Sequence, residues 1–128
     1  MLYTILCYND EKVTTSWTKA EDDAVMARLG AITQRLAAEG KLGPVARLHP
    51  TGQATTLRKN KNGPVVTDGP FAETKEHLLG FYVVDCESVD DVVAIAKELQ
   101  AANSGPGSYE IRPVMFFVGT DGKPAPAA

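Results

Sequence analysis

The segment Asp68-Gly69-Pro70-Phe71 lies near the middle of the chain, and neither a helix nor a central strand can continue through it. Pro70 has no backbone N–H and a fixed φ, and it disfavours the helical region for the residue before it. Gly69 can adopt the positive φ that a tight turn requires. The segment therefore predicts a rigid corner, and we expect Phe71, a large apolar residue, to anchor this corner to the core.

Asp68 has two interpretations at this corner. In the first, its carboxylate only accepts backbone N–H groups after the proline, as a turn or helix-capping residue. A short helix after the corner would then place Glu73 and Glu76 in its first turn, where the helix dipole favours negative charge. In the second, one carboxylate oxygen faces a pocket and takes part in proton transfer.

A strand-helix-strand pattern occurs on each side of the corner. Apolar runs rich in β-branched and aromatic residues predict strands at residues 2–8 and 80–85. The Thr18–Glu21 capping box begins a helix predicted over residues 19–39, with apolar residues at helical spacing. A second helix follows Ser88 and ends before Asn103, and a last strand is predicted over 109–118, with Pro113 at an edge or a bulge.

The region between the first helix and the corner reads as a strand at 45–48, a turn at 49–52 and a hairpin. The hairpin strands are predicted at 54–58 and 64–67, and its tip at 59–63 contains Asn62-Gly63. Two polar segments are expected at the surface, namely the short loop at 9–11 and His77. Trp17, just before the first helix, is either a residue that packs back on that helix or a pocket wall.

These elements predict an α+β fold with both long helices on one face of a sheet. The apolar strands and the run at 114–118 offer more hydrophobic surface than two helices cover. Such surfaces mark partner sites, so we expect a symmetric homodimer that packs sheet against sheet. Residues 1–118 form the predicted domain, and 119–128 form a flexible Gly/Pro/Ala tail without a core pattern.

Composition excludes several classes of protein. The chain has 128 residues, 44% hydrophobic and 23% charged, which fits one globular domain. A net charge of −3 without a basic run argues against a nucleic-acid partner. No apolar run approaches the ~20 residues of a membrane span and no signal peptide precedes the first strand, so we expect a cytoplasmic protein. Cys7 and Cys86 are predicted core residues, and no metal-ligand spacing or cofactor fingerprint is present.

Polar residues near the predicted strand ends give candidate chemistry. A histidine beside a carboxylate is a usable general base, and His49 and Asp68 end separate predicted strands. His49 is alternatively a turn residue before Pro50. Arg58 and Arg112 lie in strands, where each forms a structural ion pair or holds a substrate carboxylate. Tyr82 is a candidate pocket wall.

Several of these segments together resemble the YCII-related family, and in particular its branch named for the Asp-Gly-Pro-Phe motif. The resemblance runs from about residue 1 to 117 in order and spacing. It implies a ferredoxin-like α+β fold that dimerises into an α/β barrel. The segments that carry it are Ala54-Thr55-Thr56-Leu57-Arg58, Thr67-Asp68-Gly69-Pro70-Phe71-Ala72-Glu73-Thr74-Lys75-Glu76, Gly80-Phe81-Tyr82 and Glu110-Ile111-Arg112-Pro113-Val114.

The resemblance also implies a function and site residues. Related proteins are thought to use a His–Asp pair near a cleft, and one relative removes chloride from a chlorinated hydroquinone. Asp68 is the aspartate of that pair here, and His49 is the histidine that the N-terminal half offers. Members of the branch are often found alongside extracytoplasmic-function sigma factors, which suggests a regulatory or stress context.

Two functions follow as hypotheses. The first is a cofactor-free acid/base enzyme that performs isomerase, lactone or dehydrohalogenation chemistry on a small aromatic-derived acid. The second is a non-catalytic dimer that binds a ligand or a protein in a sigma-factor-linked context. In the first, Asp68 and His49 are catalytic. The candidate substrate-binding residues are Arg58, Phe71, Tyr82 and Arg112.

Overall fold

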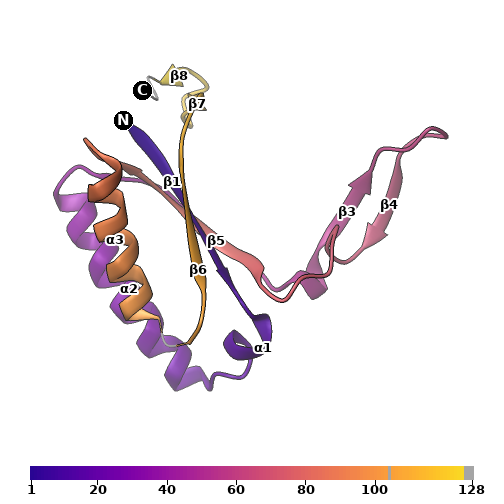
Figure 1. Cartoon of the computed structure of the whole chain (residues 1–128), viewed down its shortest axis with the longest axis horizontal. Helices are drawn as coiled ribbons and strands as arrows, with labels where there is room; N and C mark the ends of the chain where they lie inside the picture. The colour runs from indigo at the N-terminus through magenta and orange to yellow at the C-terminus, as the bar shows by residue number, and fades with distance from the viewer. Residues whose placement is uncertain (104, 126–128) are drawn as a thin grey trace.

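The computed structural model describes residues 1–103 and 105–125 as a mixed α+β structure with an antiparallel sheet (Figure 1). In the described part of the chain, the sheet has the strand order β2-β5-β1-β6, and α2 and α3 lie together on one of its faces. These elements are β1 (Leu2–Asn9), β2 (Leu42–Arg47), β5 (His77–Asp85), β6 (Ser108–Pro113), α2 (Lys19–Ala38) and α3 (Val89–Ala102). The arrangement confirms the predicted α+β class and is consistent with a ferredoxin-like fold.

Helix α2 begins and ends close to the predicted limits of 19 and 39. The hydroxyl of Thr18 accepts a hydrogen bond from the backbone N–H of Glu21 at 3.1 Å, which satisfies a donor in the first turn. The Thr18 hydroxyl also donates to the Glu21 carboxylate at 3.2 Å, so Thr18 and Glu21 contact each other through both the backbone and the side chain of Glu21. Val25 and Leu36 are its buried residues, and both belong to the predicted apolar stripe.

Helix α3 starts after Ser88, whose hydroxyl accepts from the backbone N–H of Asp91 at 3.3 Å. Its inner face is more extensively buried than that of α2, and Val92 and Leu99 are fully buried there. They pack with Ile5 and Val84 of the sheet and with Leu36 of α2 in one hydrophobic core. Since these side chains come from both helices and both central strands, this core fixes the helices on the sheet.

The central strand β5 approaches β2 closely enough to require glycine at one position. Strand β5 pairs with β1 on one side and with β2 on the other. A Cβ atom added at Gly80 would lie 2.3 Å from the carbonyl oxygen of Ala46, which backbone atoms cannot accommodate. Strand β6 is an edge strand and ends at Pro113, which agrees with the predicted edge position of this proline.

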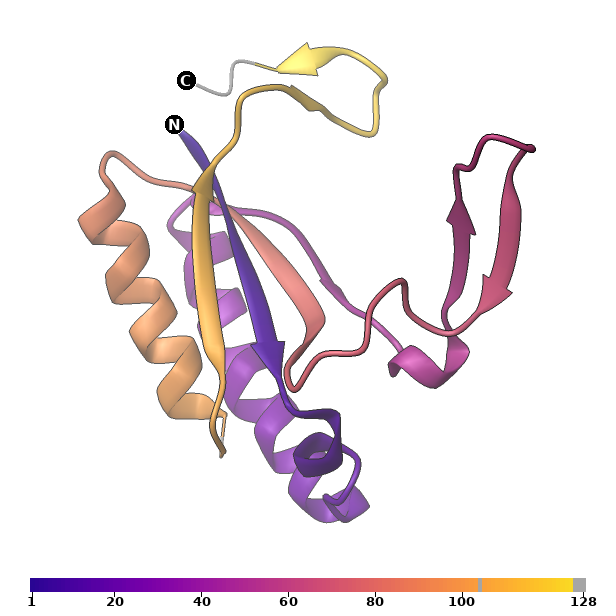
Figure 2. The ribbon, with the colours of Figure 1, turned by 45° about the vertical axis from the view of Figure 1, so that its right-hand side comes forward.

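The segment between β2 and β5 forms an arm that extends away from the sheet, on the side opposite the helices (Figures 1 and 2). Its strands are β3 (Thr55–Arg58) and β4 (Val65–Asp68), which pair with each other as the predicted hairpin. At the base of this arm, Gly69 has a φ of 96° and donates its N–H to the Ala54 carbonyl at 2.7 Å. The predicted tight turn at Gly69 is therefore present.

Three expectations for the corner are wrong. No helix follows Asp68 in the described structure, because the chain runs through irregular backbone until β5 begins at His77. Asp68 consequently caps nothing, and its residue is exposed at the end of β4. Phe71 is 73% exposed and does not reach the core, because the arm carries it away from the helix–sheet contact.

The C-terminal segment contains a short hairpin of β7 (Phe117–Val118) and β8 (Pro124–Ala125). Pro124–Ala125 of the predicted tail therefore have backbone partners in β7. Residues 126–128 of the predicted tail lie outside the described residues. Among the described residues, no helix is both long enough and apolar enough to cross a membrane.

Candidate functional site

A cavity of about 530 Å³ lies between the sheet and the N-terminal half of α2. It is also bordered by the short helix α1 (Glu11–Thr14) and by the segment that follows β2. Much of its wall is apolar or aromatic, and the aromatic side chains come from the sheet and from the segment before α2. The apolar and aromatic lining residues are Trp17, Val25, Met26, Leu29, Val45, Leu48, Leu79, Phe81, Tyr82, Leu99 and Tyr109.

The sheet side of the cavity presents groups that stay protonated at neutral pH. Burial raises the pKa of Tyr82 to about 12 and the pKa of the Cys7 thiol to about 12. Burial also raises the pKa of Tyr109. Because a thiol rather than a thiolate is present, Cys7 is a poor nucleophile, which agrees with its predicted role as a core residue.

An ion pair borders the cavity where β2 faces α2. The guanidinium of Arg47 donates to the two carboxylate oxygens of Asp22 at 2.8 and 3.3 Å. This hydrogen-bonded contact lowers the pKa of Asp22, so its carboxylate stays ionised. The two charges therefore satisfy each other at this border.

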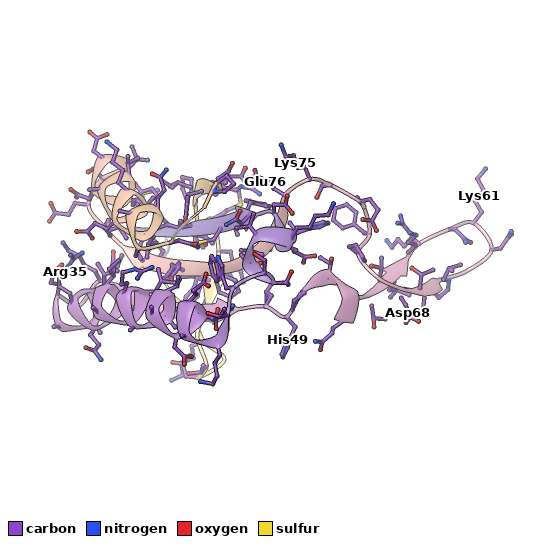
Figure 3. The ribbon with its side chains drawn as sticks, turned by 90° about the horizontal axis from the view of Figure 1, so that it is seen from below. Arg35, His49, Lys61, Asp68, Lys75 and Glu76 are labelled. Carbon is purple, nitrogen blue, oxygen red and sulfur yellow. The ribbon has the colours of Figure 1, made fainter. Side chains whose placement is uncertain are left out.

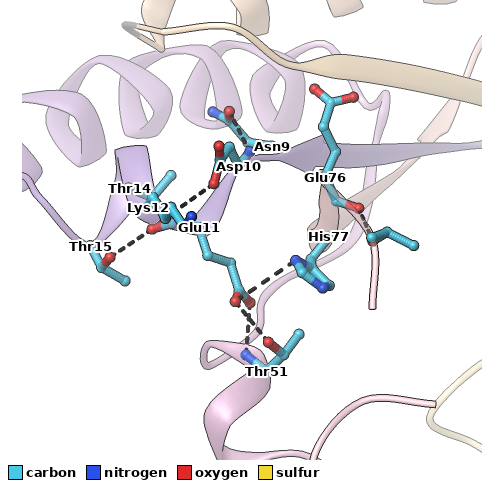
Figure 4. A network of polar contacts seen from close by, with 10 residues as sticks. Asn9, Asp10, Glu11, Lys12, Thr14, Thr15, Thr51, Glu76 and His77 are labelled. Carbon is cyan, nitrogen blue, oxygen red and sulfur yellow. Dashed lines mark hydrogen bonds and ion pairs between the residues drawn. The ribbon is translucent and has the colours of Figure 1, made fainter. Parts of the chain in front are cut away.

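A third charged side chain of the wall, Glu11, is held in place by Thr51 (Figure 4). Its Oε1 accepts the backbone N–H of Thr51 at 2.7 Å, and its Oε2 accepts the Thr51 hydroxyl at 2.7 Å. Thr51 begins the 3₁₀ helix η1 (Thr51–Gln53), so this contact joins α1 to the first part of the arm. The Glu11 side chain is 19% exposed, and two charge-assisted hydrogen bonds fix the orientation of its carboxylate.

His77 lies on the other side of this carboxylate. Its Nδ1 is 3.8 Å from Glu11 Oε2, which is longer than a hydrogen bond, and its side chain is 14% exposed. Both ring nitrogens are buried without a hydrogen-bond partner in the described structure. The expectation that His77 is a surface residue is wrong, because β5 begins three residues earlier than predicted and draws the imidazole inward.

The predicted pair His49 and Asp68 lies on different elements (Figure 3). His49 follows β2 and lines the cavity, whereas Asp68 ends β4 in the arm and is outside the cavity lining. The structure therefore brings His49, but not Asp68, to the cavity of the same chain. Their joint role in catalysis stays a prediction.

The four predicted substrate-binding residues also differ in whether they line the cavity. Tyr82 lines the cavity. Arg58 donates to the carbonyl oxygen of Phe71, so these two residues meet within the arm. Arg112 lies on β6 with an exposed side chain. Of the four, only Tyr82 belongs to the described cavity wall.

Glu11 and His77 are the site residues that sequence reasoning missed. The loop expected at 9–11 is replaced by α1, and Asn9 is 3% exposed at the end of β1. Glu11 is more than 60 positions from His77 in the chain, and no spacing rule connects them. The signal in the sequence was the acidic residue Glu11, shortly after a central strand. We expected its side chain to be solvated. Among the described residues, no group of three or more His, Cys, Asp or Glu side chains could hold a metal ion.

Comparison with known proteins agrees with the expected family. The sequence model of the YCII-related domain matches residues 1–118. A relative from Rhizobium meliloti (strain 1021), described as uncharacterized protein R00369, is 54% identical over 117 residues. The alignment covers 91% of this chain and 94% of that protein. The chain therefore belongs to the YCII-related domain family.

Proposed function

We propose that this protein binds a small, largely apolar organic molecule in the cavity between the sheet and α2. The observation that supports this function best is the cavity itself, whose volume of about 530 Å³ falls in the range of small-molecule sites. Its wall combines aromatic faces with a few fixed polar groups, which is the usual composition of such sites. The Asp-Gly-Pro-Phe segment also leads us to assign the chain to the branch of the family named for that motif.

A thermal-shift screen of small aromatic compounds with varied head groups tests this function. A ligand that binds the native state and not the unfolded chain raises the melting temperature, by more as its concentration exceeds its Kd. Val45→Trp places an indole at the cavity border, where Val45 is 42% exposed, and we expect it to reduce the shift. The matched control is Val66→Trp, since Val66 is 65% exposed in the arm. Equal shifts in both variants would show that the ligand binds elsewhere.

Acid/base chemistry is a second candidate function, favoured by the Glu11 carboxylate in the cavity wall beside His77. The expected chemistry needs no cofactor, because a carboxylate in an apolar site is itself a general base. A suitable probe is 5-nitrobenzisoxazole, a flat apolar molecule. Glu11 would accept the ring C–H proton while the C–H electrons complete the nitrile and the N–O bond breaks. The oxygen leaves as a nitrophenolate, and Glu11 returns the proton to water.

The rate of nitrophenolate release tests this second function. We expect release above the buffer rate in the unsubstituted protein and a rate at the buffer level in Glu11→Gln. The control Asp23→Asn changes the same charge on the exposed face of α2, where Asp23 pairs with Lys19, and should retain the activity. Equal rates in both variants would contradict a catalytic role for Glu11. His49 and Asp68 remain the predicted alternative pair.

We further propose that the protein acts as a symmetric homodimer, packed through the sheet face opposite the helices into an α/β barrel. Strand alternation places Leu6 on that face, since its neighbours Ile5 and Cys7 pack in the core with the helices. Beyond β6, Met115 is 96% exposed and Phe116 is 69% exposed. Apolar side chains exposed in this way are typical of association surfaces.

Light scattering on the full chain tests the assembly. We expect a dimer for the unsubstituted protein and a monomer for a Met115→Glu, Phe116→Glu double variant, because charge at an apolar interface is desolvated without a partner. These side chains are exposed, so the variant should keep its helical circular dichroism. A monomeric unsubstituted protein would contradict the proposed dimer and leave the cavity proposal unaffected.

A further inference from the structure

The charged side chains of the cavity wall differ in whether another charged side chain already pairs with them. Among the described residues that line the cavity, the side chains charged at neutral pH are Glu11, Asp22 and Arg47. Arg47 and Asp22 are paired through two hydrogen bonds at 2.8 and 3.3 Å. A ligand anion would have to compete with Asp22 for this guanidinium. Glu11 therefore provides the charge that remains for recognition, and that charge is negative.

Glu11 is also prepared to accept a hydrogen bond from a ligand. Each of its carboxylate oxygens accepts one hydrogen bond from Thr51, at 2.7 Å in both cases. An ionised carboxylate oxygen has room for a second donor, and the carboxylate can donate nothing itself. Since Thr51 fixes its orientation, little freedom is lost when a ligand binds.

The neighbours of Glu11 leave this acceptor capacity open. His77 lies 3.8 Å away, beyond hydrogen-bond distance, and neither of its buried nitrogens has a partner in the described structure. The aromatic part of the wall adds a second preference, because the faces of Trp17, Tyr82 and Tyr109 can attract a cation as well as an apolar ring. An anionic head group gains from neither feature.

We propose that Glu11 anchors the ligand and that the ligand carries a hydrogen-bond donor, best a protonated amine, on an aromatic-sized apolar body. This inference rests on the proposed binding function and specifies the ligand class for the same cavity. It predicts affinity in the order amine, alcohol, carboxylate for one ring. This ligand class differs from the aromatic-derived acid that we expected as the substrate from the sequence.

Benzylamine, benzyl alcohol and benzoate provide a matched test, because they share one ring and differ in the head group. We expect isothermal titration calorimetry on the unsubstituted protein to give the tightest binding for benzylamine, weaker binding for benzyl alcohol and none for benzoate. This comparison needs no variant and so does not depend on the folding of one. Benzoate binding as tightly as benzylamine would overturn the inference and leave the proposed function standing.

Glu11→Gln tests the anchoring residue. We expect the affinity for benzylamine to fall about tenfold or more, because a charge-assisted hydrogen bond is lost, whereas benzyl alcohol can still donate to the amide oxygen. Retained alcohol binding then shows that the cavity is intact. Asp23→Asn is the control, and its benzylamine affinity should not change. An unchanged benzylamine affinity in Glu11→Gln would overturn the inference, and no binding of any probe to the unsubstituted protein would contradict the proposed function as well.

Discussion

Glu11 and His77 meet at 3.8 Å between Oε2 and Nδ1, where the end of one central strand lies beside the beginning of the other. The two residues belong to segments on opposite sides of the arm in the chain (Figure 4). Register brings them together, because Asn9, two positions before Glu11, pairs with His77. The sheet therefore places the imidazole of His77 beside the fixed carboxylate of Glu11, which belongs to the cavity wall.

Replacement of His77 by phenylalanine is predicted to stabilise the fold. Both ring nitrogens are buried without hydrogen bonds, so folding desolvates them without compensation. Phenylalanine removes this cost while keeping a planar ring, and we expect the free energy of unfolding to rise by about 1 kcal/mol. Urea unfolding measures the change. A decrease of similar size would mean that the imidazole is hydrogen-bonded in solution.

Replacement of Thr51 by valine is predicted to destabilise the contact between α1 and η1. It removes the hydroxyl that donates to Glu11 Oε2 at 2.7 Å but keeps the backbone N–H. Since the acceptor is charged and its side chain is only 19% exposed, we expect a loss of about 1–2 kcal/mol in urea unfolding. Thr67→Val, on the exposed strand β4, is the matched control and should change stability by less than about 0.5 kcal/mol. Equal losses in both variants would contradict the role of the Thr51 hydroxyl.

Stability is predicted to fall at alkaline pH because buried acids must ionise on unfolding. Burial raises the pKa of Cys7 and of Tyr82 to about 12 and also raises the pKa of Tyr109. Their contribution is complete below the pKa values of the unfolded chain, about 8.5 for Cys and 10 for Tyr. Above those values the native state binds more protons than the unfolded chain, so the free energy of unfolding declines as pH rises toward 12.

The slope of this decline identifies the groups. Each fully titrating group contributes about 1.4 kcal/mol per pH unit, and urea unfolding at several pH values above about 9 measures the sum. Tyr82→Phe cannot ionise at this position, so the variant should show a shallower decline. An identical slope in the variant and the unsubstituted protein would show that Tyr82 does not keep its proton in the native state.

Gly69→Ala is predicted to weaken the arm without weakening the core. Gly69 has a φ of 96°, a conformation that a Cβ atom disfavours by about 1–2 kcal/mol. Hydrogen exchange measured by NMR should show about tenfold faster exchange for amides of β3 and β4 and unchanged exchange for β1. Gly52→Ala is the control, since Gly52 has no positive φ and open space around its Cα. Faster exchange throughout the sheet would mean that the arm and the core unfold together.

Local signals predicted the two long helices, α2 and α3, and the hairpin of β3 and β4 well. The Thr18 and Ser88 caps and the apolar stripe of α2 act over a few residues, so the sequence records them directly. The tight turn at Gly69 was predicted for the same reason, since proline and glycine restrict the backbone at their own positions.

The environment of individual side chains depended on contacts that the sequence does not record. Phe71 is apolar, yet the arm directs it to solvent, and His77 is polar, yet the early start of β5 buries it. The carboxylate of Glu11 acquires its role from Thr51, forty positions away. Such roles follow from the register of the sheet and from the path of the arm, and neither can be derived from local spacing.

A crystal structure of the protein with bound benzylamine would locate the ligand. We expect the ring to lie in the cavity between the sheet and α2, with the amine nitrogen within hydrogen-bond distance of Glu11. A benzylamine molecule found only outside this cavity, or a cavity that stays free of it at saturating concentration, would overturn the proposed binding site.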